Sequence, residues 1–174
     1  MSKHWYMLTV TGEDKPGIVA RITRTLFDRG MHLGEASMLR LGGNFTIMMM
    51  VAGEMDAQSL EEALSQVAAE LGLSLHIDPM QGGLHRHVPP NFIVRVSGAD
   101  KAGIVAKVTC VLAQAGFNIL GLDSDVAGSE DKPVYIMQIG GIASVPLETL
   151  EASLSGLRSE GIDVNVSPVE MLVG

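Results

Sequence analysis

Gly12-Glu13-Asp14-Lys15-Pro16-Gly17-Ile18-Val19-Ala20 is matched 86 residues later by Gly98-Ala99-Asp100-Lys101-Ala102-Gly103-Ile104-Val105-Ala106. The same shift aligns residues 11–34 with residues 97–120, with identity at ten positions, so the chain contains two copies of one unit. Each copy must therefore bury its own hydrophobic core. A glycine-flanked loop that leads into an apolar-periodic segment also has the geometry that presents free backbone N–H groups to an anion.

The repeat predicts two small domains within the 174 residues. We expect one domain at residues 1–80 and another at 91–174, joined by a linker at 81–90 whose Gly, Pro and charged residues favour an extended connector. Domains of this size bury only about two-thirds of their unfolded surface. We therefore expect the units to pack together or onto a second chain, as in a homodimer.

Composition narrows the class of partner. A formal net charge of −8 argues against direct nucleic-acid binding, which requires clustered Lys and Arg. The single cysteine, Cys110, excludes an intrachain disulfide, and the sequence has no apolar run of signal or membrane-spanning length. These features predict a cytoplasmic protein with no membrane association.

Hydrophobic periodicity predicts the same order of elements in both copies. In the first copy, strands are expected at 5–11, 31–41, 44–52 and 73–78, with one helix from Ile18 to Gly30 and another capped by Asp56 and ending at Gly72. Pro16 is expected in the first helical turn. Four residues inserted around 127–131 predict a longer hairpin loop in the second copy.

The order βαββαβ predicts the α+β class, with one antiparallel sheet per copy and both helices on a single face. In the first copy the opposite face would then carry Met7, Met48 and Met50. We expect these methionines to be covered by the other copy, a second chain or a partner, because large bare apolar patches are unusual. Coverage by the linker or the termini is the alternative.

The loop at Gly12 to Gly17 lacks the Lys and Ser or Thr that a nucleotide-binding loop needs after its last glycine. A helix start with free N–H groups suits a single small carboxylate, such as that of an amino acid. The alternative is structural: the glycines allow a tight turn and Asp14 caps the helix. His32 and Asn118 occupy equivalent positions, and we expect both beside the helix start, where each would hold a ligand group or satisfy a neighbouring backbone group.

The remaining reactive side chains form no catalytic or metal-binding pattern. His85 and His87 lie in the linker without supporting cysteines, and the acidic residues at 123–131 lack calcium-loop spacing. Cys110 has no accompanying Cys/His arrangement, and the serines show no nucleophile-elbow pattern. The sequence thus predicts a protein that is not an enzyme and that uses no cofactor or metal.

The sequences Asp-Lys-Pro-Gly-Ile-Val and Asp-Lys-Ala-Gly-Ile-Val, each followed by a helix and then by Gly-Met-His-Leu or Gly-Phe-Asn-Ile, resemble the ACT domain, an amino-acid-sensing regulatory module of ferredoxin-like topology. Two such units without an attached enzyme resemble the family of glycine cleavage system transcriptional repressors. That resemblance implies action through a protein partner, such as a transcriptional activator, rather than through DNA.

The resemblance also implies a set of ligand-binding residues, because ACT domains hold amino acids at the seam between two domains. The implied set is Asp14, Gly17, Ile18 and His32 in the first copy and Asp100, Gly103, Ile104 and Asn118 in the second. His32 departs from the commoner Asn, and Ala102 replaces the usual Pro.

We therefore expect a regulatory protein that binds a small amino acid, with glycine as the first candidate, in the control of amino-acid metabolism or transcription. A ligand-free dimerisation or protein-interaction module, and a detached regulatory subunit of an amino-acid metabolic enzyme, are the alternatives.

Overall fold

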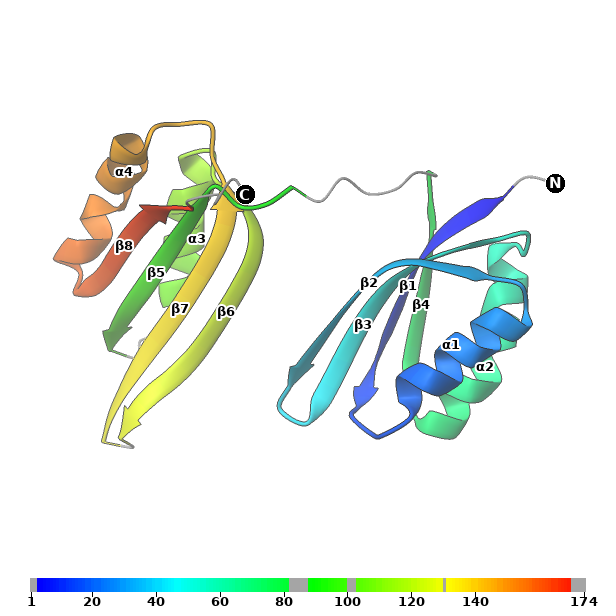
Figure 1. Ribbon diagram of the computed structural model, residues 1–174. Coiled ribbons are helices and arrows are strands. Elements are labelled where there is room, and N and C mark those ends of the chain that lie inside the picture. Colours follow the sequence, from blue (N-terminus) through cyan, green and yellow to red (C-terminus); the bar gives the residue numbers. More distant parts are fainter. Residues whose placement is uncertain (1–2, 82–87, 100–102, 130, 170–174) are drawn as a thin grey trace. The chain divides into compact units, whose positions relative to one another are not determined.

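The computed structural model describes residues 3–81, 88–99, 103–129 and 131–169. The chain divides into two compact units, Met1–Arg86 and His87–Gly174 (Figure 1). Most of the predicted linker, including His85 and His87, lies outside the described residues. None of the helices in the described parts of the chain is long and apolar enough to cross a membrane.

The first unit has the predicted βαββαβ order. Its elements are β1 (His4–Glu13), α1 (Ile18–Asp28), β2 (His32–Leu41), β3 (Asn44–Gly53), α2 (Ala57–Leu71) and β4 (Ser74–Met80). The strands form one antiparallel sheet in the order β2-β3-β1-β4, with α1 and α2 on the same face (Figure 1).

The second unit repeats this plan, so the prediction of two α+β units is confirmed. Its elements are β5 (Phe92–Ala99), α3 (Ile104–Gln114), β6 (Asn118–Ser129), β7 (Lys132–Ile142), α4 (Leu147–Ser159) and β8 (Ile162–Pro168). The strand order is β6-β7-β5-β8, again antiparallel throughout.

Alternation along the strands builds the core of each unit. Strand side chains point to the two faces in turn, and only one face meets the helices. In the first unit the buried strand residues include Tyr6, Leu8 and Val10 of β1 and Phe45, Ile47 and Met49 of β3. The helices complete this core with one stripe each, at Ile18, Ile22 and Leu26 of α1 and Leu60, Leu64 and Ala68 of α2.

Of two local expectations about the helix starts, one is confirmed and the other is wrong. The Asp56 carboxylate accepts a hydrogen bond from the Ser59 N–H at 2.8 Å, so the predicted cap of α2 is confirmed. Pro16, by contrast, lies in a turn before α1, which begins at Ile18. The left-handed conformation of Gly17, with φ of 91°, sets where this helix begins.

The expectation of a longer hairpin loop in the second unit is wrong. The last paired residues are Ser129 and Lys132 in the second unit and Leu41 and Asn44 in the first, so two residues separate the strands in both hairpins. The inserted residues instead lengthen β6 and β7. Extra residues that continue the ladder hydrogen-bond their backbone groups, whereas a loop would leave those groups to water.

The face of the first sheet that lies opposite its helices carries the three predicted methionines. Met7 is half-buried and Met48 is 46% exposed, whereas Met50 is only 4% exposed. A Cβ added at Gly34 would lie 3.3 Å from Met50 Cβ and 3.4 Å from the Trp5 ring, so this bulged part of β2 and Trp5 both lie close to Met50. Coverage of Met48 by a partner stays a prediction.

Candidate functional site

The loop between β1 and α1 is fixed to the β2–β3 hairpin at two points. The Asp14 N–H donates to the Gly43 carbonyl at 3.0 Å, and the Asp14 carboxylate pairs with the Arg40 guanidinium at 2.6 Å. The side chain of Asp14 therefore faces β2 and does not cap α1. The structural alternative in which Asp14 caps this helix is wrong.

Both first helices begin with the same open geometry. Gly17 precedes α1 with φ of 91° and Gly103 precedes α3 with φ of 90°, and among the described residues no side chain caps either helix. The first turn of a helix has N–H groups without intrahelical partners, and the positive end of the helix dipole lies there. These two helix starts can therefore accept a carboxylate.

The other predicted residues of the loop have different roles. Ile18 and Ile104 are buried in the two cores, so they anchor the helix starts and offer a ligand only their backbone. The next residues, Val19 and Val105, are each 37% exposed and leave an apolar rim beside the free amides. Asp100 lies outside the described residues.

His32 and Asn118 do not lie beside the helix starts, contrary to expectation. In the first sheet His32 pairs with Ala52, whereas Gly12, next to the loop, pairs with Phe45, seven residues away along β3. At about 3.4 Å per residue this places His32 more than 20 Å along the sheet from the loop. The helix and the residues after it carry the chain back alongside β1, so the next strand begins at the opposite end of the sheet.

A pocket of about 350 Å³ lies at the head of β2 in the first unit, where β3 ends. It is lined by Lys3, Gly30, His32, Gly53 and Glu54, and we name it the strand-head pocket. Of these residues the sequence analysis singled out only His32, and it did not consider Lys3 or Glu54. The available signal was the mismatch between the two copies, since the aligned residues of the second copy carry no charge.

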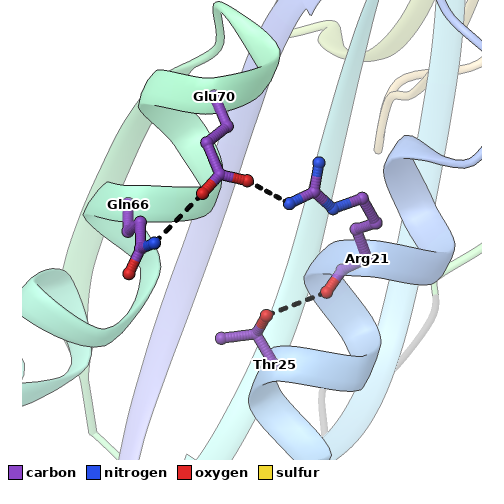
Figure 2. Close-up of polar contacts among 4 residues, drawn as sticks. All are labelled: Arg21, Thr25, Gln66 and Glu70. Atoms are coloured by element: carbon purple, nitrogen blue, oxygen red, sulfur yellow. Dashed lines mark hydrogen bonds and ion pairs between the residues drawn. The ribbon is translucent and has the colours of Figure 1, made fainter.

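A second hollow, of about 500 Å³, lies between the helices of the first unit and is lined by Ala20, Arg21, Arg24, Thr25 and Val67. Figure 2 shows that the Arg21 guanidinium points to Glu70 of α2, which also accepts a hydrogen bond from Gln66 at 3.1 Å. The other arginine pairs with Asp28 at 3.0 Å. Both arginines are thus engaged within the protein, which argues against an anion site there.

The shifted pKa values belong to structural contacts. The Ser59 backbone N–H lowers the pKa of Asp56, and hydrogen bonds from Arg21 and Gln66 lower the pKa of Glu70. Burial raises the pKa of Tyr6, whose hydroxyl donates to the Met55 carbonyl at 2.9 Å. These groups cap a helix, join two helices and anchor a loop.

The described residues offer little support for a metal-binding site or a reactive thiol. Within the described ranges no three His, Cys, Asp or Glu side chains are grouped so as to hold a metal ion. Cys110 is an exposed residue of α3, and the Gln114 amide lies 3.6 Å from its sulfur. The acidic strand residues Asp123 and Asp125 are also exposed, and Glu130 lies outside the described residues.

Comparison with known proteins gives matches over both units. A family model described as ACT domain matches residues 4–78, and another of the same description matches residues 92–152. The glycine cleavage system transcriptional repressor of Escherichia coli (strain K12) is 27% identical over 154 residues, which cover 88% of this chain and 81% of that protein.

Two crystal structures agree with the fold. An unknown protein from Galdieria sulphuraria superposes with a TM-score of 0.79 at 24% identity, covering 97% of this chain and 100% of that one. A protein provisionally described as a glycine cleavage system transcriptional repressor superposes with a TM-score of 0.69 at 19% identity, with the same coverage.

Proposed function

This chain belongs to the ACT domain family, with one such domain in each half, and on that premise we propose that it is a non-enzymatic regulatory protein that binds a small amino acid. Glycine is the first candidate ligand. The protein would act in the cytoplasm as a homodimer and pass the signal to a protein partner in the control of amino-acid metabolism or transcription.

The observation that carries the proposal is the matched pair of open helix starts. In both units a left-handed glycine precedes the helix, and no described side chain occupies the first-turn amides. A carboxylate placed there gains about 0.3–1 kcal/mol from the helix dipole and more from the hydrogen bonds it accepts. Every free amino acid carries such a carboxylate.

The second support comes from the relative in Escherichia coli, which is named for transcriptional repression of the glycine cleavage system. Our chain has a net charge of −8, which disfavours contact with DNA phosphates. If this protein acts in transcriptional control, we therefore expect it to act through a protein partner and not by direct DNA binding.

The separation of the loop from the strand head adds a geometric condition. Gly17 and His32 lie at opposite ends of the same domain, as do Gly103 and Asn118. A single small ligand that uses both kinds of group must therefore be shared between two ACT domains. This condition agrees with ligand binding at a domain seam, which the family resemblance implies.

Thermal unfolding with a panel of amino acids tests the proposal. A ligand at 100 times its Kd stabilises the folded state by about 2.7 kcal/mol, which is readily measured. We expect glycine or another small amino acid to raise the Tm at millimolar concentration. The proposal is wrong if no member of the panel does so.

A variant of the helix start then tests the mode of binding. Val19→Pro removes one first-turn N–H, which has no intrahelical partner, whereas Val19→Ala keeps it and serves as the control. We expect the ligand to stabilise the alanine variant as it does the original protein and the proline variant less. Unfolding of each variant without ligand confirms that it folds.

A ligand-free dimerisation module is the second candidate, and the exposure of β2 favours it. This edge strand is exposed at every residue and carries Leu39 and Leu41, the latter 76% exposed. Edge strands with exposed apolar residues tend to pair with another chain. Light scattering of the protein and of Leu41→Lys would give a dimer and a weakened dimer, respectively; a monomer in both cases excludes this candidate.

A further inference from the structure

We propose that the strand-head pocket of the first unit binds a zwitterionic α-amino acid, with Glu54 contacting the ammonium group and Lys3 contacting the carboxylate. This inference rests on the proposed function, that the protein binds a small amino acid, and it names a site that is separate from the two helix starts.

Two glycines line this pocket and place no side chain in it. Gly30 follows α1 with φ of 70°, a conformation that side-chain-bearing residues rarely adopt. Gly53 ends β3, and a Cβ there would lie 2.2 Å from the Met31 sulfur. The hollow of about 350 Å³ falls at the lower end of the range for small-molecule sites, about 300–1,000 Å³.

The charges of the pocket suit a molecule with one positive and one negative group. The Lys3 ammonium lies 5.5 Å from the centroid of the Trp5 ring, which holds this cation at the pocket. In the described part of the chain the ion pairs all join other residues, so neither Lys3 nor Glu54 has a described ion-pair partner and both can contact a charged ligand. The negative end of α1, next to Gly30, also favours an ammonium group.

The second unit serves as an internal comparison. The shift of 86 residues places Pro89 at the position of Lys3 and Asn118 at that of His32, and the shift of 90 residues after the insertion places Ser144 at the position of Glu54. Both units fold alike although only the first has the two charges. The fold therefore does not require Lys3 and Glu54, which points to a role in recognition.

Nuclear magnetic resonance of the ¹⁵N-labelled full chain locates the ligand. The probes are glycine, which carries both charges, acetate, which carries the negative charge alone, and methylamine, which carries the positive charge alone. We expect glycine to shift the amide signals of Gly30, His32, Gly53 and Glu54. Acetate and methylamine are expected to bind at least tenfold more weakly, since each loses one charge-assisted contact.

Two variants test the contacts directly. Lys3→Met and Glu54→Gln each remove one charge from an exposed side chain, and we expect each to weaken glycine binding about tenfold. Glu61→Gln, at an exposed position of α2 outside this pocket, is the matched control and should bind as the original protein does.

The outcomes separate the two proposals. If glycine shifts only the amides of Gly17, Ile18 and Val19 or their counterparts in α3, the strand-head pocket is overturned and the proposed function stands. Pocket signals that shift equally in Lys3→Met and Glu54→Gln overturn the assigned contacts. If glycine, L-alanine and L-serine shift no amide at all, both proposals fail.

Discussion

A pair of glycine-to-alanine substitutions near the ends of β3 and β7 gives the sharpest test of how each unit is packed. Gly141→Ala and Gly53→Ala add the same methyl group, and both glycines have ordinary negative φ values. At Gly141 the new Cβ would lie 2.1 Å from Phe117 Cε1 and 2.4 Å from the Asn118 carbonyl oxygen. At Gly53 it would lie 2.2 Å from the sulfur of Met31.

The magnitudes differ because the neighbours differ in rigidity. A methionine side chain has three rotatable bonds and can move aside, so we expect Gly53→Ala to cost about 1 kcal/mol or less. An aromatic ring and a strand carbonyl cannot both move without disturbing the sheet, so Gly141→Ala should cost about 3 kcal/mol. For a domain of this size that corresponds to a decrease in Tm of roughly 12–24 °C.

The single tryptophan allows the two units to be followed separately. Trp5 lies in β1, so its fluorescence reports the first unit, whereas far-ultraviolet circular dichroism reports both. We expect Gly141→Ala to add an early transition in circular dichroism and to leave the Trp5 transition in place. Gly53→Ala should move the Trp5 transition only slightly.

Equal losses of stability in the two variants would refute this reasoning, as would a Gly141→Ala protein that melts like the original. Adding Phe117→Leu to Gly141→Ala provides a further control. Because the Asn118 carbonyl oxygen stays 2.4 Å from the new methyl group, the smaller side chain should restore only part of the lost stability.

Three further sets of substitutions have expected outcomes. Asp56→Ala should lower the Tm by a few degrees near neutral pH, and Asp56→Asn by less. Because the pKa of Asp56 is lowered in the folded state, its contribution to stability is present above the unfolded pKa and is lost as the pH falls through the folded pKa. Urea titrations of Asp56→Ala and of the original protein should therefore converge in acid. Gly17→Ala should cost about 1–2 kcal/mol in urea unfolding through its left-handed φ alone, since nothing lies within 4 Å of the added Cβ; a neutral result would contradict the assigned conformation. Arg21 pairs with Glu70 (Figure 2), so Arg21→Glu should destabilise the first unit, and the double variant with Glu70→Arg should recover most of that loss at low salt. At 1 M salt the variants should differ little, because both side chains are exposed.

Sequence reasoning succeeded where the signal was local. The repeat of the Gly12 to Ala20 segment predicted two equivalent units, and the alternation in β1 and β3 identified the buried face of the first sheet. The Asp56 cap was also predictable, because a cap and the amide it satisfies lie within one turn of each other. Such patterns are read over a few residues and need no knowledge of distant segments.

The site was harder to predict because its parts come from distant segments. Asp14 had an acceptable local role as a helix cap, and only the β2 register brought Arg40 within 2.6 Å of it. The structural effect of the insertion near residue 130 was equally hard to predict, since the sequence does not say whether extra residues continue a ladder or form a loop.

The sequence by itself thus determined the duplication, the order of elements, the buried faces and the glycines that open both helix starts. Only the tertiary structure decided that His32 lies at the far end of the sheet from Gly17 and shares a pocket with Lys3 and Glu54. The physical reason is that periodicity reports which face of an element is buried. Which groups meet at its ends depends on helix length, strand register and turn geometry together.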